Sequence, residues 1–159
     1  MSFSPEEQAV VEGVSALLTR YVTAYVHADK AGFSSCFHKD VSMAAGDTFL
    51  SRTDLREQRE GAPHYFDTRV GHWSPPLRTT LSVSPINRVA ALGKVRWMYP
   101  ATSTGLEYLN VSLYLCVLAG GEWKILMVTT PTEAGEELVT GPRIHLSWDV
   151  PRWPIHRQP

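Results

Sequence analysis

Two tyrosines four residues apart, Tyr21 and Tyr25, are the side chains best suited to hold an oxygen atom of a ligand. A buried phenol needs a hydrogen-bond partner, and in a binding pocket that partner can belong to the ligand. The alternative is a core aromatic whose hydroxyl reaches water or a backbone carbonyl, and this interpretation is favoured for Tyr25. Tyr21 falls in the middle of an apolar stripe, so we expect its hydroxyl to project into the interior.

A strand expected over residues 107–118 divides its side chains between two faces. One face carries aromatic and polar groups, namely Tyr108, Asn110, Ser112, Tyr114 and Cys116. The other face is wholly aliphatic, with Leu109, Val111, Leu113, Leu115 and Val117. The pattern does not decide which set lines the interior. An aliphatic outer face would need a cover, which favours a homodimer formed through the sheet face.

Charged groups that could take part in chemistry are few. Asp47 or His64 could supply a base, although Asp47 more simply fits a turn. An inward Arg96 could anchor an anion or a carbonyl group, but a surface arginine or an interface ion pair is the favoured alternative. The six histidines do not fall at His-x-x-x-His spacing on a helix. We therefore predict no metal site and no cofactor.

The first third of the chain is predicted to be mainly helical. Ser4-Pro5 followed by two glutamates is typical of a helix start. The stripe that follows has three- and four-residue spacing and should end near Asp29; its members are Val10, Val14, Leu17, Tyr21 and Tyr25. A short second helix is expected over 30–37, a strand over 40–43, a turn at 46–47 that returns through 48–50, and a charged third helix over 52–60.

The second half is predicted to be strand. Candidate strands cover residues 77–84, 88–99, 107–118 and 122–130, and their short connections indicate an antiparallel meander. Beyond Pro131 the pattern fades. The last stretch, 147–159, carries two tryptophans, which are costly to expose. We expect this tail to pack on its own domain or on a dimer partner.

Composition indicates one globular domain. The 159 residues are 43 % hydrophobic and 19 % charged, with a net charge of −1. No dense run of basic residues favours nucleic acid, and no apolar stretch is long enough for a membrane span. Cys36 and Cys116 lie in apolar contexts, which favours free buried thiols. The N-terminus lacks the features of a secretion signal, so a cytoplasmic location is expected.

With these elements in order, residues 8–130 resemble the nuclear transport factor two-like superfamily, which includes SnoaL-like polyketide cyclases and ketosteroid isomerases. The resemblance is closest in Arg20-Tyr21-Val22-x-Ala24, at Asp29 and Phe37, and in Asp40-Val41-Ser42-Met43. It implies an α+β fold in which a cone-shaped, curved antiparallel sheet wraps around N-terminal helices, as in a cystatin-like roll. It also implies a deep, mostly apolar pocket and commonly a dimer. The domain would span 1–131, with 132–159 as a C-terminal extension.

The resemblance transfers only part of the isomerase machinery. Tyr21 matches the tyrosine that donates to the developing oxyanion, and Tyr114 falls at the position of the protonated acid beside it. The catalytic base falls on Ala45, and alanine cannot move a proton, which argues against steroid isomerisation by that mechanism. By the same alignment, four residues would face the cavity: Trp123, Ile125, Met127 and Thr129.

The sequence thus favours a pocket protein that binds a small, mostly apolar, oxygen-bearing molecule. Tyr21 and Tyr114 would hydrogen-bond the oxygen. Further ligand contacts are expected from Tyr25, Arg96, Asn110, Trp123 and Met127. An enzymatic reaction would be an isomerisation, cyclisation or dehydration through an enol-like species, without a cofactor. The alternative is a non-catalytic dimeric binding or association module.

Overall fold

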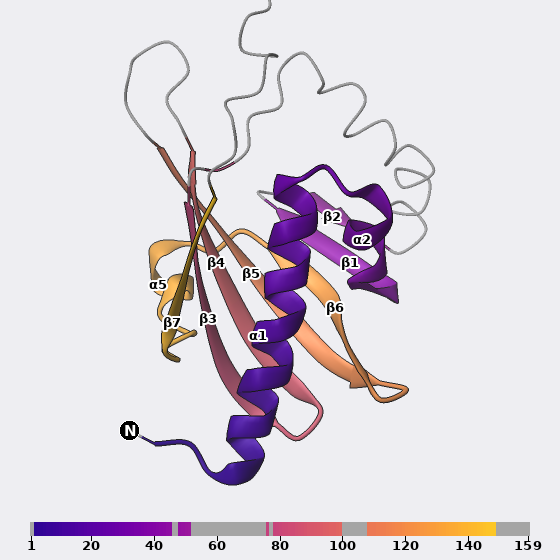
Figure 1. Cartoon of the computed structure of the whole chain (residues 1–159), viewed down its shortest axis with the longest axis vertical. Helices are drawn as coiled ribbons and strands as arrows, with labels where there is room; N and C mark the ends of the chain where they lie inside the picture. The colour runs from indigo at the N-terminus through magenta and orange to yellow at the C-terminus, as the bar shows by residue number, and fades with distance from the viewer. Residues whose placement is uncertain (1, 46–47, 52–75, 77, 100–107, 149–159) are drawn as a thin grey trace, which may run out of the picture.

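The computed structural model describes residues 2–45, 48–51, 76, 78–99 and 108–148 (Figure 1). The third helix expected over 52–60 lies outside these residues, as do Asp47 and His64. The described elements are α1 (Pro5–Val26), α2 (Lys30–Ser35), β1 (Phe37–Ala45), β2 (Thr48–Leu50), β3 (Arg78–Asn87), β4 (Ala90–Tyr99), β5 (Tyr108–Ala119), β6 (Glu122–Thr129), α5 (Glu133–Glu136) and β7 (Arg143–Ser147).

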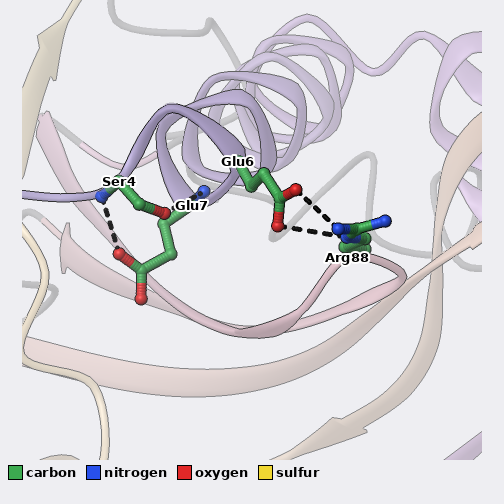
Figure 2. Close-up of polar contacts among 4 residues, drawn as sticks. All are labelled: Ser4, Glu6, Glu7 and Arg88. Carbon is green, nitrogen blue, oxygen red and sulfur yellow. Dashed lines mark hydrogen bonds and ion pairs between the residues drawn. The ribbon is translucent and has the colours of Figure 1, made fainter.

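The helix α1 begins where the sequence predicts. The Ser4 hydroxyl accepts a hydrogen bond from the Glu7 amide at 3.2 Å, and the Ser4 amide donates to the Glu7 carboxylate at 2.8 Å (Figure 2). This reciprocal capping box satisfies two backbone groups at the helix start. The predicted stripe is buried at Val10, Val14, Leu17 and Tyr21, while Tyr25 is half-buried. Leu18 and Val22 beside it are buried as well. The apolar face of α1 therefore lies against the sheet, where it forms the core.

The seven strands form one sheet in the order β2-β1-β6-β5-β4-β3-β7, with α1 lying across one face (Figure 1). The predicted meander of β3, β4, β5 and β6 is confirmed, because each consecutive pair is antiparallel. The α+β class and the curved sheet are confirmed as well. One neighbouring pair differs from the antiparallel expectation: β1 runs parallel to β6.

Register across the sheet decides which strand faces point toward α1, because directly paired residues share a face. Tyr114 contacts Tyr21 of α1 and pairs with Gly93 and Val128. This face is called the inner face below. Asn110, Ser112 and Cys116 share it with Tyr114, whereas the aliphatic set of β5 lies on the outer face. The sequence left open which set of side chains on this strand lines the interior, and the register shows that it is the aromatic and polar set.

The chain beyond Pro131 is more regular than the sequence pattern indicates. Thr132 caps α5, and β7 pairs antiparallel with β3. The connection crosses the outer face, since the Lys94 ammonium donates to the Glu136 carbonyl at 3.0 Å. A run of five residues is too short to give a distinct strand signal. Residues 149–159 lie outside the described part, so the packing of the Trp-rich tail stays a prediction.

Candidate functional site

The centre of the candidate site is a buried contact between two phenols, one from α1 and one from β5. The Tyr114 hydroxyl donates to the Tyr21 hydroxyl at 3.3 Å. Tyr114 is 1 % exposed and Tyr21 7 % exposed. The pair that the sequence proposed from two distant segments is therefore brought together inside the fold.

Aromatic rings surround Tyr21 on several sides. Phe33 of α2 stacks on it with ring centroids 5.1 Å apart, and Phe37 meets it edge-on at 5.6 Å. Trp97 of β4 approaches edge-on at 6.0 Å, and Tyr114 at 5.2 Å. Such edge-to-face and stacked contacts are favourable in addition to the area they bury. The Tyr21 ring therefore lies within an aromatic cluster and has very little access to water.

Burial controls the acidity of Tyr114. Its pKa is raised well above the usual value of 10.0, because removal from water disfavours the phenolate, and hydrogen bonds with Tyr21, Ser112 and Trp97 oppose this only in part. Tyr114 therefore keeps its proton across the physiological range. In chemical terms it is a permanent hydrogen-bond donor and not a base.

A second phenol pair lies one helical turn further along α1. The Tyr99 hydroxyl donates to the Tyr25 hydroxyl at 3.4 Å. Trp97 joins the two pairs, since its ring lies 5.1 Å from Tyr25 and 6.0 Å from Tyr21. The expected ligand-binding residue Tyr25 is thus close to Tyr21, and its hydroxyl has a side-chain partner.

Trp123 lies on the inner face but in a different part of it. A Cβ atom on Gly13 would stand 2.5 Å from the Trp123 Nε1 atom, so the indole packs directly on the helix at that glycine. Gly13 precedes Tyr21 by eight residues, which is about 12 Å along a helix. Trp123 therefore packs on α1 about two turns before Tyr21, and its contact with a ligand stays a prediction.

Two further expected ligand contacts lie on the outer face. The register between β5 and β6 shifts by one residue opposite Leu115 and Cys116, so Ile125 pairs with Cys116 but Met127 pairs with Leu115. The shift reverses the face to which the later β6 side chains point. The expectation that Met127 and Thr129 face the cavity is wrong for this reason, while Ile125 is buried on the inner face. Arg96 alternates with inward Trp97 and lies 3.7 Å from the Glu136 carboxylate. Arg96 therefore lies on the outer face, as the favoured alternative of a surface arginine has it.

The remaining predicted residues are placed only in part. Asn110 shares the inner face with Trp97, its direct partner, but is exposed. Asp47 and His64 lie outside the described residues, so their role as a base stays a prediction. Ala45 is the last residue of β1.

Sequence reasoning left two contributors unassigned. Trp97 could not be assigned to the site, because the face of β4 cannot be chosen without its register. Thr79 was not considered at all, although its hydroxyl is buried and has no hydrogen-bond partner among the described residues. No sequence signal distinguishes such a threonine from an ordinary strand residue.

Among the described residues no cluster of three metal-ligating side chains is found, nor is any helix there both long and apolar enough to cross a bilayer.

Comparison by sequence identifies no relative. No protein-family model matches the chain, and no curated protein is significantly similar to it.

Comparison by structure gives clear matches. A nuclear transport factor two-like protein of unknown function from Shewanella oneidensis shares 14 % identity, with 75 % of this chain and 96 % of that one covered and a TM-score of 0.58. A cystatin-like protein of unknown function from Nostoc punctiforme shares 12 %, with coverage of 82 % and 93 % and a TM-score of 0.54. A scytalone dehydratase-like protein from Novosphingobium aromaticivorans shares 10 %, with coverage of 89 % of each chain and a TM-score of 0.54.

These identities are too low to transfer an activity, and they establish the fold. The chain has the cystatin-like α+β fold of the nuclear transport factor two-like proteins. The resemblance inferred from the sequence is confirmed at this level.

Proposed function

We propose that the protein binds a small, mostly apolar molecule through one of its oxygen atoms, with the Tyr21 hydroxyl as the direct donor. The observation that carries this proposal is the buried hydrogen bond from Tyr114 to Tyr21. A phenol that accepts such a bond becomes a better donor itself, since hydrogen bonds in a chain polarise one another. The rings of Phe33, Phe37 and Trp97 support an apolar, aromatic-lined environment for the rest of the molecule.

This arrangement suits reactions in which negative charge develops on the bound oxygen. When a base removes a proton from a carbon next to a carbonyl, the C–H electrons move into an enolate and the oxygen becomes negative. Fixed donors in a site with little water stabilise that charge. We propose isomerisation, cyclisation or dehydration of this type, without a cofactor, with Asp47 or His64 as the base.

The test compares two probes that differ by one oxygen, 2-naphthol and naphthalene, titrated against the protein and followed by probe fluorescence. Tyr21→Phe removes one hydrogen bond, worth about 0.5–1.5 kcal/mol, so 2-naphthol should bind roughly 2- to 12-fold more weakly. Naphthalene should bind as before. The melting temperature should fall somewhat, because the buried Tyr114 hydroxyl loses its acceptor.

The matched control is Tyr99→Phe, which removes the other hydroxyl of the neighbouring phenol pair, at a residue not expected to touch the ligand, and should leave 2-naphthol affinity nearly unchanged. If Tyr21→Phe lowers the melting temperature and leaves the preference for 2-naphthol over naphthalene intact, Tyr21 has a structural role and the proposal fails.

The outer face of the sheet favours a second candidate function, that of a dimeric association module. Leu109 is 44 % exposed there. Val111, Leu115 and Met127 are half-buried on the same face. An aliphatic surface of this kind supports a homodimer formed through the sheet face.

The two free thiols, Cys36 and Cys116, support a reducing, cytoplasmic setting.

A further inference from the structure

The outer face of β4, β3 and β7 gathers basic side chains that are far apart in the sequence. Register places Arg96, Thr80 and His145 side by side in one row across the three strands. The next row holds Lys94, Ser82 and Arg143, and the row on the other side places Arg78 between Met98 and Ser147. We call Arg78, Lys94, Arg96, Arg143 and His145, which surround Thr80, the basic plate.

Within the described part of the chain, an acidic residue contacts the basic plate at its β4 end. At the β4 end, Glu136 accepts the Lys94 ammonium on its carbonyl and lies 3.7 Å from Arg96 through its carboxylate. Burial lowers the pKa of Lys94, and the positive charge of Arg96 lowers it further, as Arg143 does, while Glu136 and Glu137 oppose this. At the β7 end, exposed Arg143 has no ion-pair partner among the described residues. The excess of positive charge therefore lies beside β7.

The strand β7 also offers backbone groups for pairing. It stands last in the strand order, next to β3, and within the described part of the sheet it has a neighbour on one side only (Figure 1). An edge strand presents unpaired N–H and C=O groups that can accept one more strand. Arg143 and His145 point to the outer face, while Ile144 between them points to the inner face and is 38 % exposed.

We propose that an extended acidic peptide segment of a partner protein docks along β7 as an additional strand. Its backbone would pair with the open edge, which is how peptides extend sheets in other recognition modules. Strand side chains alternate, so Asp or Glu at every second position would face the basic plate. The positions between would be apolar and would cover Ile144. The structure thus assigns a partner motif of alternating acidic and aliphatic residues.

The probe for this interaction is a fluorescein-labelled peptide, Glu-Val-Glu-Val-Glu-Val, followed by fluorescence anisotropy. It should bind, bind more weakly as salt is added, and exceed the affinity of the Lys-Val counterpart. Arg143→Glu should weaken binding by about 3- to 10-fold, and Arg143→Gln by less, since exposed pairs of charges contribute modestly.

The matched control is Arg88→Glu. Arg88 is also an exposed arginine, but it lies in the turn after the other end of β3 and pairs with Glu6 at 2.6 Å (Figure 2). This variant should bind the peptide like the unmodified protein. Equal losses in the Arg143 and Arg88 variants would overturn the proposal, because general charge would then explain the binding.

Two further probes separate strand addition from simple charge attraction. The same peptide with every backbone nitrogen methylated has no N–H group left to donate to β7 from either of its edges, so its binding should be lost; retained binding would overturn the docking mode. A single-stranded poly(A) RNA that bound as tightly as the peptide, and lost affinity in Arg143→Glu, would assign the basic plate to polyanions and overturn the acidic-peptide assignment.

Discussion

At the scale of single residues, burial decides which protons the side chains of the inner face keep. It raises the pKa of Tyr114 above its usual value of 10.0 and that of Cys116 from 9.0 to about 12. The pKa of Cys36 is raised as well, again first by burial. A group whose folded pKa is raised stabilises the fold below its unfolded pKa, and this contribution is lost as the pH rises toward the folded pKa.

The first prediction concerns the alkaline range. Between pH 9 and about 12, the Cys116 thiol ionises in the unfolded chain but stays protonated in the native state. The free energy of unfolding should therefore fall by about 1.4 kcal/mol per pH unit for this one group. Urea unfolding of the unmodified protein and of Cys116→Ala at several alkaline pH values measures the difference in slope.

The variant should be less stable near neutral pH, because it leaves a small cavity, but its slope should be shallower by one proton. Identical slopes would show that Cys116 is as accessible to ionisation in the native state as in the unfolded chain.

At the scale of elements, one glycine sets how closely α1 approaches the sheet. A Cβ atom on Gly93 of β4 would stand 2.5 Å from the Leu18 Cδ1 atom, and Leu18 is fully buried. Gly93 is also the direct sheet partner of Tyr114, while Leu18 precedes Tyr21 by one turn. The missing side chain therefore lets α1 lie near enough for the two phenols to meet.

Gly93→Ala should lower the free energy of unfolding by about 1–3 kcal/mol, since an added methyl overpacks a filled core. Urea or thermal unfolding measures the change. The double variant with Leu18→Ala removes the colliding atom, so the two effects should be non-additive. Strict additivity would mean that Gly93 and Leu18 do not constrain each other.

How far the sequence predicts each element depends on how local its signal is. The helix α1 is defined by a cap and a stripe within one segment, and the meander by turns between neighbouring strands, so both were predictable. Tyr21 followed from the stripe. The placement of Met127 was not predictable, because a single register shift between β5 and β6 reverses the faces of the residues after it. The pairing of β7 with β3 depends on contacts more than fifty residues apart.

At the scale of the whole molecule, the outer face of the sheet has two halves of different chemistry. The half on β5, with Met127 of β6 beside it, is aliphatic, and the half on β4, β3 and β7 carries the basic plate. The crossover through α5 lies between β6 and β7 and covers Lys94, which is 6 % exposed. Association with a second copy and docking of an acidic segment would therefore use different parts of one face.

A homodimer through the aliphatic half predicts a mass twice the 17.7 kDa of one chain in size-exclusion chromatography with light scattering. Val111→Lys should shift the protein to the single-chain mass, because it puts a charge into the buried interface. Phe49→Lys is the matched control, since Phe49 is 62 % exposed on β2, and its mass should not change. A single-chain mass for the unmodified protein would rule out this homodimer.

The parallel pairing of β1 with β6 has a consequence for synthesis of the protein. Met43 of β1 pairs with Val128 of β6. The ribosome must therefore translate some eighty further residues before β1, the first strand to be made, can pair with β6. Contacts between such distant parts of a chain slow folding, because a long loop must close before they form. Until β6 has been translated, the apolar face of α1 has no complete sheet to pack against. The nascent chain is then most exposed to non-native contacts with other molecules.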